Sequence, residues 1–360
     1  MGSITTKPNI AVVVGGYSGE YDVSISTGDA IYTNVDRSRY NLYKIVIPRD
    51  PKASWYHLTD SGSEIPVDRN DFSVTLPSSS SSSSNQKITF DLAYISIHGN
   101  PGENGVLQGY FDMLSLPYTS CGFYTSALTA NKGHCNPVVS SFGIVAVAKS
   151  KLLHRTQITS PTFSTTDTDA LLQELSLPVF VKPASGGSSV ATTKVKSREA
   201  FAQAVQDAMA EDGNGQVLVE EFIAGREFDC GLIRDAEGKL HVFPVTEVIP
   251  TGDSEYFDYN AKYNGSSSKV TPAEVEEEVS DEIKEVSAKL YDLLDCRGVV
   301  RFDYRYDTDK KKLFFLELNT IPGQTPESMV PQQARAAGIS TAELYHMVIE
   351  GALAQAKASS

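Results

Sequence analysis

Short apolar runs that alternate with amphipathic segments are the feature that most restricts how this 360-residue chain can fold. Residues 10–14, 43–47 and 92–97 have the length and composition of buried strands, and residues 24–35 and 105–115 have helical spacing. Strands that alternate with helices pair in parallel, because the helix carries the chain back to the starting edge of the sheet. The order therefore predicts an α/β fold with a mostly parallel sheet in its N-terminal part.

The pattern changes near residues 127–132, where we expect a linker or a domain boundary. The elements expected beyond it are, in order, a strand–loop–strand at 177–195, a helix at 198–209, a strand at 216–222, a helix at 274–294, a β-hairpin at 298–319 and a closing helix at 342–356. Serines 78–84 are expected to form a flexible surface loop, to which we assign no chemistry.

The charge balance and the cysteine content exclude several functional classes. Acidic residues outnumber basic ones by 45 to 31, which gives a formal charge of −14. Nucleic acids and anionic membranes bind clustered lysine and arginine, so neither is an expected partner. The four cysteines form no CxxC pair, and no run of about 18 apolar residues exists. We therefore expect free thiols, no membrane span and a cytoplasmic location.

The hairpin at 298–319 has an unusual arrangement of charge. If its strands pair about Lys310, Asp303 lies opposite Glu317 and Arg301 lies opposite Asn319, all on one face. The opposite face then carries Phe302, Tyr304, Leu316 and Leu318. Two carboxylates at ~4 Å repel by about 4 kcal/mol at an effective dielectric of 20, and a Mg²⁺ ion bound through oxygen ligands would remove that cost. Pairing of the acids with Arg301 on a solvated face is the alternative.

A glycine–serine loop follows Lys182 and has the groups that a polyphosphate needs. Gly186 and Gly187 permit close approach of the backbone, and two serine hydroxyls follow them. The loop is not a P-loop, and residues 15–19 are not a GxGxxG fingerprint, which argues against a hydride-transfer enzyme. A plain turn between strands is the alternative interpretation.

Two further candidates are weak by themselves. Glu220 and Glu221 end a strand where a carboxylate and backbone groups would suit adenine and ribose, although exposed acids are common there. His98 ends a strand before a glycine-rich turn, and a structural hydrogen-bonding role is the alternative to a functional one there. No HExxH or GxSxG pattern occurs, so zinc chemistry and serine hydrolysis are not expected.

Taken in order, seven segments resemble those of the D-alanine–D-alanine ligase family of the ATP-grasp superfamily, over nearly the whole chain. They are residues 15–20 with 23–24, 97–109, 116–119, 182–189, 256–263, 317–325 and 328–331. The resemblance implies an N-terminal α/β domain at 1–128 and two α+β domains at 129–225 and 226–360, with ATP between the last two. It also implies ATP-dependent ligation of two D-alanines through an acyl phosphate, which yields D-alanyl-D-alanine for peptidoglycan precursors.

The same resemblance assigns the nucleotide and metal ligands. Lys132 and Lys182 would neutralise ATP phosphates, and Lys262 would add charge near the γ-phosphate. The residues that would hold adenine and ribose are Glu220, Glu221, Ile223 and Glu227. The residues that would carry two Mg²⁺ ions, with Mn²⁺ as an alternative, are Asp303, Glu317 and Asn319.

The substrate residues are assigned in the same way. Glu20 would pair with the ammonium of the first D-alanine, while Arg301 and the backbone N–H of Gly323 would stabilise the oxyanion of the tetrahedral intermediate. Ser328 and Met329 would bind the carboxylate of the second D-alanine. Ser188 and Tyr263 would link to Glu20 and close a loop over the site, which keeps water from the acyl phosphate.

Tyr263 also bears on the acceptor, because relatives that make D-alanyl-D-lactate tend to lack a tyrosine there. D-alanine–D-lactate ligase is nevertheless the close rival, and a non-catalytic nucleotide-binding regulator is a rival of another class. Relatives are usually homodimers, so a homodimer is expected. Asn131, Asn104, Ala191 and Asn260 depart from common family residues, although none has an assigned catalytic role.

Overall fold

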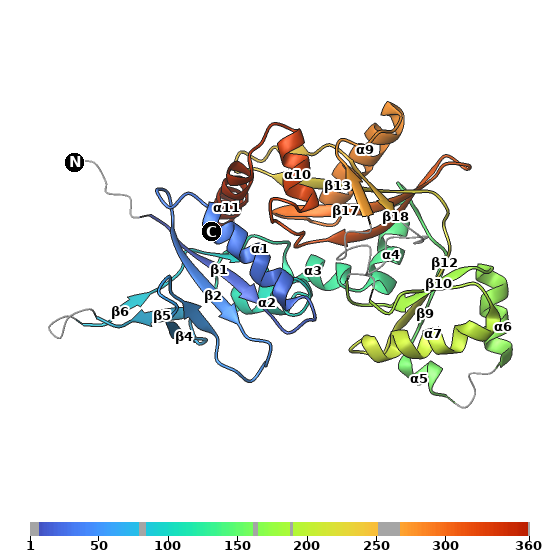
Figure 1. Cartoon of the computed structure of the whole chain (residues 1–360), viewed down its shortest axis with the longest axis horizontal. Helices are drawn as coiled ribbons and strands as arrows, with labels where there is room; N and C mark the ends of the chain where they lie inside the picture. The colour runs from blue at the N-terminus through green and yellow to red at the C-terminus, as the bar shows by residue number, and fades with distance from the viewer. Residues whose placement is uncertain (1–6, 79–83, 161–164, 188–189, 251–266, 359–360) are drawn as a thin grey trace.

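The computed structural model describes residues 7–78, 84–160, 165–187, 190–250 and 267–358, and its architecture is shown in Figure 1. Three β-sheets form the framework of this part of the chain, and helices cover their faces. The α/β class predicted from the alternating segments is confirmed. The serine tract at 78–84 lies almost entirely outside the described residues.

The first sheet has seven strands in the order β6-β5-β4-β3-β2-β1-β7. Its strands are β1 (Asn9–Gly15), β2 (Asn41–Ile47), β3 (Tyr56–Leu58), β4 (Glu64–Asp68), β5 (Ser73–Leu76), β6 (Gln86–Ile88) and β7 (Leu92–Ile95). Only β2, β1 and β7 pair in parallel, and β3 to β6 extend the sheet by antiparallel pairing. The sheet is therefore mixed rather than mostly parallel, because the segment between β2 and β7 folds as consecutive hairpins.

Strand β1 is buried on both faces, as expected for a central parallel strand. Ile10, Val12 and Val14 pack on one side in a core that includes the C-terminal helix α11 (Thr341–Ala358). The alternate residues, Ala11 and Val13, pack on the other side with helix α2 (Val106–Met113). Helix α1 (Tyr21–Asn34) also packs against β1 and lies beside α11 in Figure 1.

Helix α11 joins the end of the chain to its beginning. Leu344, Tyr345 and Val348 are buried in the same core as β1. The hydroxyl of Tyr40 donates to Glu350 Oε1 at 2.6 Å and lies 2.5 Å from His346 Nδ1. The N-terminal sheet is thus completed by residues more than 300 positions away in the sequence.

The second sheet has four antiparallel strands in the order β11-β10-β12-β9. They are β9 (Ser150–Leu153), β10 (Val179–Pro183), β11 (Thr193–Val195) and β12 (Val217–Glu221). Its core also contains residues of helices α6 (Thr165–Leu175) and α7 (Arg198–Glu211), and the short helix α5 (Arg155–Ile158) follows β9. This sheet carries the predicted phosphate loop directly after β10.

The third sheet has the order β16-β15-β13-β17-β18-β8, with β14 paired to β13. The strands are β8 (Ala146–Val147), β13 (Arg226–Arg234), β14 (Leu240–Val242), β15 (Thr246–Pro250), β16 (Ser267–Val270), β17 (Val299–Asp307) and β18 (Lys312–Asn319). The associated helices are α3 (Phe123–Thr129), α4 (Lys132–Ser141), α9 (Glu277–Leu293) and α10 (Met329–Ala336).

Two elements of residues 129–225 join this third sheet. Strand β8 pairs with β18, and Cys135 and Val139 of α4 belong to the core beneath the sheet. The domain limits at 128 and 225 stay a prediction.

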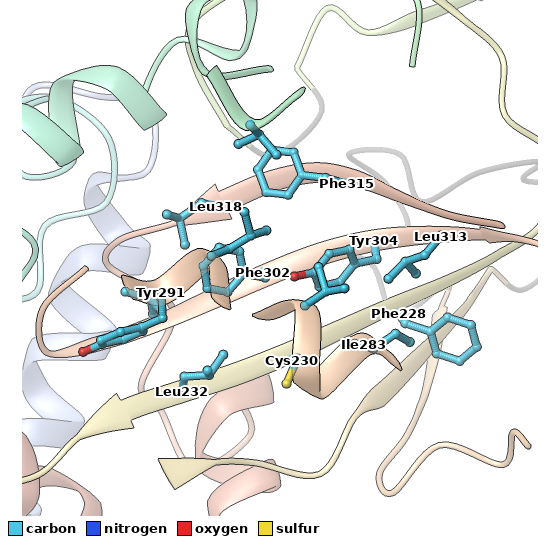
Figure 2. Packing of buried hydrophobic residues seen from close by; sticks show 14 of the residues in the cluster. Phe228, Cys230, Leu232, Ile283, Tyr291, Phe302, Tyr304, Leu313, Phe315 and Leu318 are labelled. Atoms are coloured by element: carbon cyan, nitrogen blue, oxygen red, sulfur yellow. The ribbon is translucent and has the colours of Figure 1, made fainter. Parts of the chain in front are cut away.

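The hairpin β17–β18 has the predicted register at its functional end and a different one beyond it. Arg301 pairs with Asn319 and Asp303 with Glu317, as the pattern predicts. A bulge then shifts the register, so that Tyr304 faces Phe315 rather than Leu316. Phe302, Tyr304, Phe315 and Leu318 pack in the core with α9, as Figure 2 shows in part. Leu316, expected on that face, instead lines the opposite cavity, because the bulge turns it over.

Candidate active site

A cavity of about 1560 Å³ is lined by residues of the second and third sheets and by the segments that follow β1 and β7 of the first sheet. Acidic side chains outnumber lysines and arginines in its lining. The residues assigned a binding or catalytic role from the sequence that line it are Glu20, Lys132, Lys182, Glu220, Glu221, Ile223, Glu227, Arg301, Asp303, Glu317, Asn319 and Met329. Segments far apart in the sequence therefore present their predicted site residues to one space.

Arg301 neutralises one of the two opposed acids of the hairpin. Its Nε donates to Asp303 Oδ1 at 2.7 Å and its second nitrogen donates to Oδ2 at 2.9 Å. Asn319 Nδ2 also donates to Asp303 Oδ2, at 3.2 Å. The Arg301 and Asp303 side chains are only 15% and 13% exposed, so this is not a solvated face. Burial alone would lower the pKa of Arg301, but Asp303 outweighs it and the pKa is raised.

Lys132 neutralises the second acid and links the hairpin to the loop after β10. Its Nζ lies 2.8 Å from Glu317 Oε2 and donates to the Gly186 carbonyl at 3.0 Å. Burial lowers the pKa of Lys132, but the Glu317 carboxylate, together with Glu220 and Glu103, raises the pKa above its usual value, so the ammonium is held charged. Helix α4 begins at this lysine. Its first side chain therefore connects Glu317 of the hairpin with the glycine–serine loop after β10.

Asn131 immediately before Lys132 explains one departure from the family pattern. Its Oδ1 accepts from His134 N at 3.1 Å and caps α4, while its Nδ2 donates to Ser185 Oγ at 3.0 Å and Gln216 Oε1 at 2.8 Å. An aspartate could serve as the cap but has no donor for the other two groups. The amide thus fixes the loop from the second sheet against α4.

The far side of the cavity suits a base and a sugar. Lys182 is ion-paired with Glu220, whose Oε1 accepts from Asn136 Nδ2 at 3.0 Å. Glu227 pairs with Arg305 at 2.6 Å, and Glu221 Oε1 accepts from Lys149 N at 2.8 Å. The apolar side chains of Ile223, Phe180 and Leu316 also line this cavity. Apolar walls with a few fixed polar groups are typical of nucleotide and other small-molecule pockets.

The segment between β1 and α1 contributes Glu20 to the cavity. Its backbone N–H donates to Ser18 Oγ at 3.2 Å, and Ser18 Oγ donates to the His98 carbonyl at 2.8 Å. A Cβ added to Gly187 would lie 3.3 Å from Glu20 Oε2, so the loop after β10 reaches this carboxylate. Ser188, which was expected to bond to Glu20, lies outside the described residues, as do Lys262 and Tyr263.

Two neighbours of Glu20 have shifted pKa values. Burial raises the pKa of Glu103 to about 8, and the negative charge of Glu20 adds to the increase. Glu103 Oε2 accepts from Gly99 N at 2.7 Å. Burial also lowers the pKa of His98, whose Nε2 lies 3.1 Å from Thr27 Oγ1. His98 is therefore a neutral, hydrogen-bonded residue next to the site.

Gly323 and Ser328 lie together where the chain leaves β18 and enters α10. A Cβ added to Gly323 would lie 2.8 Å from Ser328 Oγ, so a side chain there would displace the serine. Ser328 Oγ is 2.8 Å from Thr325 Oγ1, and the next residue, Met329, lines the cavity. The turn thus leads to Met329 at the start of α10, which lines the cavity, whereas Gly323 and Ser328 are not among the lining residues.

Sequence reasoning missed Asp229 of β13, which is 2% exposed and also lines the cavity. It pairs across the sheet with Asp303, so a row of three acids crosses β13, β17 and β18. Burial raises the pKa of Asp229 to about 8, although Arg301 lowers it. Glu103 was also missed. An aspartate within an otherwise apolar strand, and an acid inside a quoted motif, were the available signals.

The hairpin donors fit a magnesium ion. Asp303 and Glu317 supply carboxylate oxygens, Asn319 an amide oxygen, and both acids are held by side-chain cations. No group of three histidine, cysteine or acidic side chains in the described part of the chain has metal-binding geometry. Mg²⁺ commonly uses one or two carboxylates and completes its shell with phosphate oxygens and water, so this donor set suits it when a nucleotide is present.

The sheets and the cavity that they enclose define an enzyme of the ATP-grasp class. A family model described as "D-ala D-ala ligase N-terminus" matches residues 9–121, and one described as "D-ala D-ala ligase C-terminus" matches residues 138–350. The chain belongs to the D-alanine–D-alanine ligase family.

Relatives named D-alanine–D-alanine ligase cover almost the whole chain. The protein from Phocaeicola vulgatus is 41% identical over 344 residues, which are 96% of this chain and 99% of the relative. Among solved structures, the VanG D-Ala:D-Ser ligase from Enterococcus faecalis matches with a TM-score of 0.79 and 30% identity, over 96% of this chain and 99% of that one. The D-alanine–D-alanine ligase from Coxiella burnetii matches with a TM-score of 0.80 and 26% identity, over 98% of this chain and 96% of that one. No helix within the described residues is long and apolar enough to cross a membrane.

Proposed function

We propose that this chain joins two D-alanines into D-alanyl-D-alanine at the expense of ATP and so supplies a peptidoglycan precursor. The observation that carries the proposal is the meeting of Glu20, the loop after β10 and the hairpin acids in one cavity. Membership of the ligase family and the names of its relatives support the substrate.

In the first step the carboxylate of one D-alanine attacks the γ-phosphate of ATP and releases ADP. Phosphoryl transfer depends on positioning and on neutralisation of charge, for which lysines suffice without a protein nucleophile. Lys132 and Lys182 neutralise the phosphates in this proposal. Both are ion-paired here, to Glu317 and Glu220, so nucleotide binding replaces or shares these contacts. Glu220, Glu221, Ile223 and Glu227 hold the adenine and ribose.

Asp303, Glu317 and Asn319 would hold Mg²⁺, whose charge offsets that of the phosphates. We propose two ions, with Mn²⁺ as a substitute. Arg301 already binds both oxygens of Asp303, which orients that carboxylate and limits its freedom before a metal arrives.

In the second step the amine of another D-alanine attacks the acyl carbon, and phosphate leaves. Glu20 binds the ammonium of the first D-alanine, while Arg301 and the Gly323 N–H stabilise the negative oxygen of the tetrahedral intermediate. Ser328 and Met329 receive the carboxylate of the second amino acid. The cluster of Glu20, Arg301 and Met329 around one cavity supports these roles. Ser188, Tyr263 and Lys262 complete and close the site in the proposal.

The product of the reaction tests the proposal. The protein is incubated with ATP, Mg²⁺ and D-alanine, with D-serine, D-lactate or L-alanine as a second acceptor, and products are identified by mass spectrometry. D-alanyl-D-alanine as the main product is expected. A mixed D-alanyl-D-serine product would instead align the chain with its VanG-type structural relative, and depsipeptide near neutral pH would contradict the role of Tyr263. Absence of phosphate release with ATP and D-alanine together would favour a non-catalytic regulator.

We also propose a cytoplasmic homodimer. The four cysteines are buried free thiols, which suits a reducing compartment. Four large apolar side chains are exposed on the neighbouring helices α2 and α3, namely Val106, Met113, Phe123 and Tyr124. Light scattering should give twice the chain mass, and a Met113→Lys variant should reduce it if this surface forms the contact.

A further inference from the structure

A fully buried glutamine on α10 is hydrogen-bonded to strand β13 in place of a neighbouring strand. Gln333 Oε1 accepts from Gly231 N at 2.9 Å, and its Nε2 donates to the Asp229 carbonyl at 3.1 Å. The same Nε2 lies 2.7 Å from Asp229 Oδ1 and 2.9 Å from Thr246 Oγ1. Both ends of the side-chain amide are therefore satisfied within a region that excludes water.

The glutamine occupies a gap in the ladder of the third sheet. On this edge of β13, β15 pairs with Glu227–Asp229 and β14 pairs with Leu232–Arg234. The Asp229 carbonyl and the Gly231 N–H fall between these partners and bond to the glutamine amide instead. A Cβ at residue 231 would lie 2.5 Å from Gln333 Oε1, so glycine is required there for the close approach of the amide.

The contact of Gln333 with β13 joins the two parts of the molecule that the proposed function places around the acceptor, namely the start of α10 and the strand that carries Arg301. Gln333 lies four residues after Met329, so both lie on the same face of α10, one turn apart. On the other side of β13, Gly231 is paired with Arg301 and Asp229 with Asp303. The side chain of Gln333 thus connects α10, one turn beyond Met329, to β13, which is the strand beside Arg301.

One carboxylate oxygen of Asp229 has no hydrogen-bond partner among the described residues. Asp229 Oδ1 accepts from Gln333, whereas the buried Oδ2 is the oxygen without a partner among these residues. Asp229 lines the cavity together with Arg301 and Met329. A network in which the Gln333 amide has all its hydrogen-bond partners, and which borders the site, is suited to fix geometry rather than to react.

We infer that Gln333, acting through Asp229 and Gly231, is a positioning residue that sets the distance between the start of α10 and Arg301 and thereby the binding of the acceptor amino acid. The inference rests on the proposed function, which places the acceptor carboxylate at Ser328 and Met329. In the proposed function the ammonium of the donor lies at Glu20 and the phosphates lie at Lys132 and Lys182, which belong to other elements, so their binding depends less on this contact. Loss of the contact should therefore affect the two halves of the reaction unequally.

The experiment compares the two half-reactions in a Gln333→Leu variant. Dipeptide synthesis requires the acceptor site, whereas hydroxylamine traps the acyl phosphate of the first D-alanine as a hydroxamate without using an acceptor carboxylate. A misplacement of about 1 Å can reduce a rate about a hundredfold, so we expect the KM of the acceptor D-alanine to rise roughly ten- to a hundredfold. Hydroxamate formation and the KM of ATP should stay within about twofold of the wild-type values.

A Ser287→Ala variant is the matched control. Ser287 Oγ lies 2.8 Å from Tyr304 Oη in the core on the opposite face of the same sheet, so its loss removes a buried polar pair away from the cavity. This variant should change both assays equally or not at all. A parallel fall of both activities in Gln333→Leu, or an unchanged acceptor KM, overturns the inference.

A milder variant covers the case in which Gln333→Leu does not fold. Thr246→Val keeps the shape of a side chain that is 0% exposed and removes one acceptor of the glutamine amide, together with the hydrogen bond between Thr246 Oγ1 and Thr271 Oγ1. The acceptor KM should rise roughly two- to fivefold with hydroxamate formation unchanged, because the amide keeps its other partners. An unchanged acceptor KM in this variant also counts against the inference. If the wild-type protein forms neither hydroxamate nor dipeptide, the proposed function fails instead.

Discussion

Replacement of Glu317 by glutamine removes one of the two opposed carboxylates of the hairpin and keeps the size of the side chain. Glu317 Oε2 lies 2.8 Å from Lys132 Nζ, and the two side chains are 21% and 15% exposed. Lys132 retains the Gly186 carbonyl at 3.0 Å, and a glutamine amide oxygen can still accept from it. Only the charge-assisted part of the bond is lost, which costs about 1–2 kcal/mol of stability, so we expect the variant to fold.

The effect on magnesium should be larger than the effect on stability. Partners that merely orient metal ligands are worth about 10- to 100-fold in metal affinity, so loss of a charged ligand should cost at least that much. We therefore expect the Mg²⁺ concentration for half-maximal activity to rise at least about 10-fold. Activity at a fixed, low Mg²⁺ concentration should fall by a similar factor.

Phosphate release with ATP and D-alanine, measured over a Mg²⁺ titration, is the assay. Glu285→Gln is the control, because Glu285 is an exposed acid of α9, 3.5 Å from Lys289, and does not line the cavity. Both variants lose one negative charge, so the comparison separates a ligand from a general electrostatic effect. An unchanged Mg²⁺ requirement in Glu317→Gln, with turnover near the wild-type value, would refute the metal role of the hairpin.

Four further outcomes are expected. The pKa of Glu103 is raised to about 8, so the stability that its protonated form contributes is complete below about pH 4.3 and is lost as the pH rises through 8. In that window the free energy of unfolding of the wild type should fall by up to about 1.4 kcal/mol per pH unit relative to that of Glu103→Gln. Denaturation curves at several pH values will measure this difference. Lys182→Met should raise the KM of ATP about tenfold or more, with little change in the KM of D-alanine, because the phosphates lose a cation. Tyr263→Phe should relax acceptor choice, seen as a higher ratio of depsipeptide to dipeptide when D-lactate competes with D-alanine; an unchanged ratio would count against its role. Ala191 has φ 50°, a left-handed conformation, so Ala191→Gly should raise the unfolding free energy by about 1 kcal/mol, and a loss of stability there would contradict the strain argument.

The sequence predicted those parts of the fold that depend on the alternation of side chains along a strand and on short turns. The register of Asp303 opposite Glu317 follows from strict alternation and a short charged turn, and both are visible in the sequence. The register shift at Leu316 is not visible in the sequence, because phenylalanine and leucine at 314–316 suit either face of a strand. Only packing against α9 decides which face each side chain occupies. The short strands β3 to β6 were missed since each has too few residues for a periodic signal.

The site residues divide in the same way. The cavity brings together the acids and lysines that the family resemblance assigned and that the structure describes, whereas Glu103, inside one of the quoted segments, was missed. Asp229 and Gln333 were not found, because a polar residue in an apolar strand gains its meaning only from a partner 104 positions away. Two polar side chains that satisfy each other across a helix and a strand produce no pattern in either segment alone.

The place of α11 against β1 has a consequence for how the molecule reaches its final state during synthesis. Strand β1 is made before α11, yet one of its two apolar faces is covered by residues 344–352, which are synthesised more than 300 residues later. Until then that face stays open to water and to wrong partners, a known hazard for contacts of large sequence separation. Removing α11 should therefore yield aggregated polypeptide rather than a shortened ligase, even though no residue of that helix lines the catalytic cavity.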